Sequence, residues 1–179
     1  MDQKTKAIFD KLEWKLQALE QELSDLPVEQ LSKSPKPGAW SVLDILHHLK
    51  LAEAYGHKYS EKKLSFNPSL PKDNWQAQFR SWLLNTFNRS SLKVKAPKGV
   101  DESFFPKEIP FEQIMEEWKA QRKALRTFLE GLDPEIYTKQ VYKHPLGGRL
   151  SLADMLRFFD SHFDRHHRQI QRTYSSSKN

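Results

Sequence analysis

The chain has 179 residues, enough for one domain with a substantial core, so we predict a single domain over residues 1–179. It carries 29 Lys and Arg against 23 Asp and Glu, a net charge of +6, and it has no cysteine, which excludes disulfides and thiol ligands. No apolar run approaches membrane-spanning length and the polar N-terminal segment does not resemble a signal peptide, so we expect a cytoplasmic protein with no membrane partner.

The first third of the chain predicts two helices. Apolar residues recur every three or four positions over Thr5–Leu26, the spacing of an amphipathic helix. Pro27 ends this helix, and the Pro35–Gly38 segment suits only a loop. Ser41 then has the character of a helix N-cap, and the helix that it begins is predicted to run to about Ser60.

The middle of the chain predicts one helix and one long connection. Aromatic and apolar residues at helical spacing indicate a helix over Trp75–Phe87. The connection Arg89–Pro110 contains three prolines, and loops of this length often carry function. Its Lys-rich part, Lys93–Lys98, lacks aromatic residues that would stack on bases, and basic residues elsewhere alternate with acidic ones. We therefore predict no binding of nucleic acid.

The last third predicts two further helices. One covers Phe111–Leu129, with Gly131 as its C-cap. Lys139–Lys143 suits at most a short extended piece, and a turn follows over His144–Gly148. The final helix starts at a Ser151 cap. Four main helices, short helical pieces and long loops predict an all-α protein built as a four-helix bundle.

Histidines on the predicted helices suggest a metal site. His162 and His166 are one helical turn apart, and both fall on the apolar stripe of the last helix. In the second helix His48 lies at the edge of the buried stripe, whereas His47 turns about 100° away and is expected to be solvated. Three neutral imidazoles would bind a divalent metal and leave a coordination position for water or substrate. The alternative is that they are core histidines that bond to the backbone or to one another.

The same residues resemble the DinB-like superfamily of four-helix bundles. The match includes Pro37–Ser41 leading into His48-Leu49, the turn His144–Gly148 with Ser151, and His162 to Ile170 with His166 and Gln169. The resemblance implies a divalent metal held by His48, His162 and His166. Because three imidazoles serve several first-row metals, Zn, Ni, Mn and Fe are all candidates. It also implies a thiol S-transferase acting with a low-molecular-weight thiol, or a hydrolase, and a homodimer.

The leading hypothesis is therefore a metal-dependent enzyme that activates water or a thiol on a small-molecule substrate. Asp44 and Gln169 are candidates to orient the histidines, although Asp44 also suits a capping role and Gln169 a marginal surface position. The alternative hypothesis is a non-catalytic bundle that binds a small ligand or a protein, with a structural metal or none.

Overall fold

The computed structural model describes residues 1–90, 105 and 109–176. Within them the chain forms six α-helices, a 3₁₀ helix and one β-hairpin. The elements in chain order are α1 (Gln3–Ser24), α2 (Val28–Ser32), α3 (Val42–Ser65), α4 (Trp75–Arg89), α5 (Phe111–Glu130), η2 (Pro134–Thr138), β1 (Gln140–His144), β2 (Gly148–Ser151) and α6 (Leu152–Ser176).

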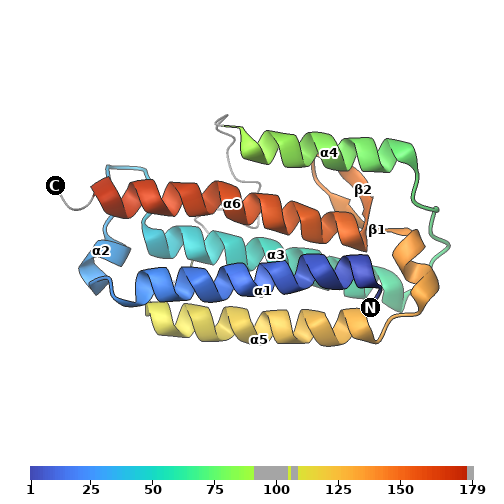
Figure 1. Cartoon of the computed structure of the whole chain (residues 1–179), viewed down its shortest axis with the longest axis horizontal. Helices are drawn as coiled ribbons and strands as arrows, with labels where there is room; N and C mark the ends of the chain where they lie inside the picture. The colour runs from blue at the N-terminus through green and yellow to red at the C-terminus, as the bar shows by residue number, and fades with distance from the viewer. Residues whose placement is uncertain (91–104, 106–108, 177–179) are drawn as a thin grey trace.

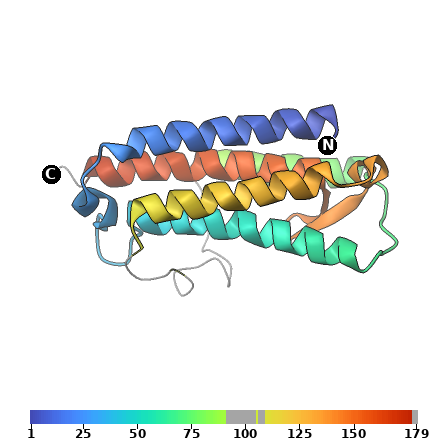
Figure 2. The same ribbon diagram turned by 90° about the horizontal axis from the view of Figure 1, so that it is seen from below.

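Four long helices, α1, α3, α5 and α6, lie side by side along the long axis of the molecule (Figure 1, Figure 2). Helix α4 lies outside this group and packs against α6 and β2. The predicted all-α class and four-helix bundle are confirmed. The long connection Arg89–Pro110 falls mostly outside the described residues.

The two helices that carry the candidate ligands have the predicted caps. Ser41 Oγ accepts a hydrogen bond from the Asp44 backbone N–H at 3.2 Å, and Asp44 Oδ2 accepts one from the Ser41 backbone N–H at 2.9 Å. At the start of α6 the Asp154 backbone N–H donates to Ser151 Oγ at 3.2 Å. These caps fix where α3 and α6 begin, and thereby which side chains face each other.

A β-hairpin precedes α6, where the sequence indicated only one short extended piece. Strand β1 pairs antiparallel with β2, and Gly148 takes a left-handed φ of 67° at the end of the turn. His144 closes this turn, because its Nδ1 accepts hydrogen bonds from the backbone N–H groups of Leu146 and Gly147 at 3.1 and 2.9 Å.

The bundle core combines apolar side chains with one buried ion pair. Glu53 of α3 bonds to Arg122 of α5, and both are almost fully buried. Two turns of α3 beyond His48, Gly56 lets α3 and α6 approach closely, since a Cβ at this position would lie 2.6 Å from Phe159 Cζ. This close approach brings the histidine-bearing faces of α3 and α6 together.

Helix α4 exposes its largest apolar side chains to solvent, unlike an ordinary surface helix, which buries them. The aromatic spacing correctly predicted a helix, but Trp75, Phe79 and Trp82 are 73%, 50% and 59% exposed. Its buried residues are Ala77, Ser81, Leu84 and Asn88. Among the described residues, no helix is both long enough and apolar enough to span a membrane.

Candidate metal centre

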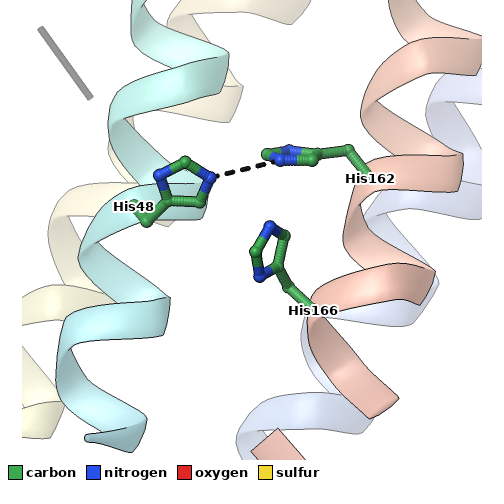
Figure 3. Close-up of side chains that lie close together, drawn as sticks. All are labelled: His48, His162 and His166. Atoms are coloured by element: carbon green, nitrogen blue, oxygen red, sulfur yellow. Dashed lines mark hydrogen bonds between the residues drawn. The ribbon is translucent and has the colours of Figure 1, made fainter. Parts of the chain in front are cut away.

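The structure brings His48, His162 and His166 together between α3 and α6. Figure 3 shows the His48 ring reaching from α3 toward the two rings of α6. The Nε2 atoms of His48 and His162 lie 3.2 Å apart, and one nitrogen from each of the three rings lies within 4.8 Å of the other two. The predicted convergence of these three side chains is therefore seen in the fold.

Aromatic rings surround the three imidazoles. Trp40, just before α3, has its ring centroid 4.9 Å from that of His48 and 6.4 Å from that of His166. On the other side Phe158 stacks on His162 at 5.1 Å with an interplanar angle of 18°. His48 and His166 are buried, whereas His162 is half-buried. The rings are thus held by packing, with His162 nearest to solvent.

This environment keeps the α6 imidazoles neutral near pH 7. Burial, reinforced by the neighbouring His48, lowers the pKa of His166 to about 3. Burial, followed by His166 and His48, also holds the pKa of His162 well below its usual value. Neutral imidazole has a free ring nitrogen lone pair, which is the form that binds a metal.

Gln169 lies against one of the rings. Its Oε1 lies 3.0 Å from His166 Nδ1, and a carboxamide oxygen only accepts hydrogen bonds. His166 therefore carries its proton on Nδ1 and keeps the lone pair of Nε2 free. A metal-binding histidine commonly has this arrangement, with its second nitrogen bonded to a fixed acceptor. This contact is the one that the orienting role predicted for Gln169 requires, and that role stays a prediction. Asp44 caps α3.

One pair of nitrogens has the spacing expected around a small ion, whereas the group of three spans up to 4.8 Å. Two imidazole nitrogens that each lie about 2.0–2.1 Å from a tetrahedral Zn²⁺ are roughly 3.4 Å apart. The 3.2 Å between His48 Nε2 and His162 Nε2 is close to this separation. The three-residue group contains no carboxylate, so an ion bound there would keep its full double charge.

The expectation that His47 is solvated is wrong. His47 is 3% exposed, and its ring stacks on Phe105 with centroids 6.2 Å apart. Its Nδ1 is buried without a hydrogen-bond partner among the described residues, and burial lowers its pKa. Helical phase placed His47 on the outer side of α3, but phase alone does not show that Phe105 covers that side.

Sequence reasoning did not assign Trp40 and Phe158 to the site. The spacing of Phe158, four residues before His162 on one helix face, was a usable signal for its stacking. Trp40 lies within the Pro37–Ser41 motif, but the position of its ring depends on how the loop before α3 folds. Two surface hollows of about 300 and 470 Å³ lie along α5, and neither is lined by the three histidines.

A family model described as the DinB superfamily matches residues 11–170. The chain belongs to the DinB superfamily. No curated protein matches this DinB-superfamily chain. A solved structure with a similar fold is described as "YfiT from Bacillus subtilis is a probable metal-dependent hydrolase with an unusual four-helix bundle topology". The TM-score is 0.59 at 17% identity, over 97% of this chain and 87% of YfiT, so the likeness concerns the fold.

Proposed function

We propose that this DinB-superfamily protein is a metal-dependent enzyme whose ion is held by His48, His162 and His166. The observation that carries the proposal is the convergence of three imidazole nitrogens within 4.8 Å of one another. Histidines that served only as core residues would need other buried acceptors. The 3.2 Å contact between His48 Nε2 and His162 Nε2 also suits a hydrogen bond between two core histidines, so it does not separate the two interpretations. The third ring favours an ion, because Gln169 Oε1 lies at His166 Nδ1 and leaves the Nε2 of His166 to face the other two rings (Figure 3).

Neighbouring side chains set the orientation and the protonation state of the histidine ligands. Gln169 holds the proton of His166 on Nδ1, and Phe158 fixes the plane of His162. Trp40 packs against His48 and Phe158 stacks on His162, so apolar rings cover part of both imidazoles, which lowers the local dielectric and strengthens electrostatic interactions there. A divalent ion bound by three neutral ligands supplies Lewis acidity toward a water or thiol in its remaining position.

We favour a hydrolase-like reaction on a small molecule, in which water is the nucleophile. The description of YfiT as a probable metal-dependent hydrolase supports this choice. Transfer of a low-molecular-weight thiol stays a prediction that rests on the family resemblance. The homodimer rests on the same resemblance and also stays a prediction. The single domain over residues 1–179, the cytoplasmic location and the choice among Zn, Ni, Mn and Fe stay predictions that rest on the sequence and on imidazole chemistry.

Elemental analysis of protein purified without a His tag tests the proposal. We expect close to one divalent ion per chain in the wild type and almost none in the His162→Ala/His166→Ala variant. His167→Gln is the matched control, because His167 is adjacent to His166 but bonds to Glu22 of α1 at 2.6 Å. Circular dichroism verifies that each variant is helical. Retention of the ion by the double variant would contradict the ligand assignment.

Activity is tested separately with a panel of small esters and amides, and with thiol transfer to electrophilic substrates. We expect turnover that a chelator abolishes and that the added metal restores. If the ion is bound in the predicted stoichiometry but no substrate in either class is turned over, the metal centre stands and the enzymatic part of the proposal is rejected in favour of a binding bundle.

A further inference from the structure

The outer face of α4 presents large apolar side chains to solvent. Trp75, Phe79, Trp82 and Leu83 are 73%, 50%, 59% and 47% exposed, and their helical spacing places them on one side. The rings of Phe79 and Trp82 stack on each other, with centroids 5.8 Å apart. We call these four residues the α4 aromatic face.

The inner face of α4 holds the helix to the bundle through polar contacts. Ser81 Oγ donates to Asp154 at 2.9 Å, and Asn88 Nδ2 donates to Ser161 Oγ at 2.9 Å. Asn85 Oδ1 accepts a hydrogen bond from the same Ser161 hydroxyl. Ala77, Leu84 and polar residues thus face the protein, while the aromatic residues Trp75, Phe79 and Trp82 face outward. This arrangement leaves the apolar side of α4 to contact something outside the bundle.

Cationic residues lie along α4, the helix that carries the aromatic face. Helix α4 has no Asp or Glu, and Lys72 and Arg89 lie at its two ends. Arg80 donates to the Gly147 and Arg149 carbonyls, which places the exposed Arg149 of β2 beside α4. Arg168 of α6 likewise lies beside the end of α4, because it donates to the Asn88 carbonyl at 3.2 Å.

The acidic neighbours do not offset these cations. Asp154 is buried, and its carboxylate bonds to Ser81 and Arg157. Asp73, which precedes α4, is half-buried, and its Oδ1 accepts a hydrogen bond from the Asn74 backbone N–H. The edge of the aromatic face therefore carries net positive charge.

We propose that the α4 aromatic face docks this protein onto the surface of an anionic lipid bilayer. Tryptophan has a polar N–H on an apolar ring and is favoured at the level of the lipid headgroups. A helix with Trp, Phe and Leu on one face and basic residues around it is suited to lie in that layer, where the cations meet anionic headgroups.

Charge and area favour a bilayer over a second copy of the chain. The exposed parts of the four side chains amount to roughly 400–500 Å², which is below the roughly 800 Å² that each partner buries in a standard interface. Pairing two copies through this face would also bring two sets of cations together. The prediction of no membrane partner rested on the lack of a spanning segment, but a helix lying in the headgroup layer needs none.

The test is co-sedimentation of the full-length protein with lipid vesicles. One set contains equal parts of phosphatidylglycerol and phosphatidylcholine, and the other contains phosphatidylcholine alone. We expect sedimentation with the anionic set that weakens as salt is added, and a blue shift of tryptophan emission on binding. The Trp75→Gln/Trp82→Gln variant should lose about tenfold or more in partitioning. Trp14→Gln is the matched control, because Trp14 is 66% exposed on α1.

Three results would overturn the proposal. The first is no sedimentation with anionic vesicles, and the second is equal sedimentation of the wild type and the double variant. The third is a dimer in analytical ultracentrifugation that the double variant converts to monomer while vesicles bind neither protein, which would assign the face to a second copy. None of these results depends on the histidine centre, so both variants are expected to keep the metal content of the wild type.

Discussion

Replacing Glu53 with Gln is expected to lower the free energy of unfolding by about 3–5 kcal/mol. The Glu53 carboxylate accepts hydrogen bonds from Arg122 Nε and Nη2 at 2.9 and 2.7 Å, and from Trp118 Nε1 at 2.8 Å. Arg122 also donates to the Leu12 carbonyl, so this group ties α3, α5 and α1 together. A Gln side chain has one acceptor oxygen, and its NH₂ group would face a guanidinium N–H. The variant removes the two hydrogen bonds of the buried guanidinium to a carboxylate and leaves Glu13, 3.5 Å from Arg122 Nη1, as its anionic neighbour.

Urea unfolding followed by circular dichroism measures this loss, which corresponds to a fall in melting temperature of roughly 6–20 °C. Glu20→Gln is the control, because Glu20 accepts a hydrogen bond from Lys119 and both side chains are partly exposed, at 30% and 49%. A surface pair of this kind contributes about 0–1 kcal/mol. If the two variants lose the same free energy of unfolding to within about 1 kcal/mol, burial is not what makes the Glu53 contacts stabilising, and the argument is refuted.

Three further predictions concern the histidines and the α3–α6 contact. Burial lowers the pKa of His144 to about 4 and that of His166 to about 3, so the unfolded chain takes up protons below pH 6.5 before the folded one does. Unfolding of the metal-free protein should therefore become easier as pH falls from about 6.5 to 4.5, by about 2–3 kcal/mol for each group; a flat profile would contradict this. Gln169→Leu should weaken metal binding in calorimetric titration about 10- to 100-fold, and unchanged affinity would exclude the orienting role. Gly56→Val should lower the melting temperature because its side chain would collide with Phe159, and an unchanged value would show that α6 shifts freely.

The helices could be predicted because their signals are local. Ser41 with Asp44 and Ser151 with Asp154 mark the helix starts directly, and both caps are present. The same helical phase placed His162 and His166 on one face. Helical phase also made His48 the candidate third ligand, and the family resemblance supported that choice, because phase alone does not specify which helices pack together.

The features that could not be predicted from the sequence depend on contacts between distant parts of the chain. The second strand of the hairpin is set by pairing with β1, and a four-residue strand has almost no periodic signal of its own. His47 is buried because Phe105 packs on it from a distant part of the chain. The sequence also did not show which face of α4 is exposed. Trp75, Phe79 and Trp82 have the spacing of a core-facing stripe but lie on the outside.

The most direct test of the metal centre is anomalous scattering from crystals of the metal-loaded protein, recorded at the absorption edge of the bound ion. The account predicts one strong peak at about 2.0–2.2 Å from a nitrogen of each of His48, His162 and His166. A peak elsewhere in the molecule, or rings of these three residues turned away from a shared point, would contradict it.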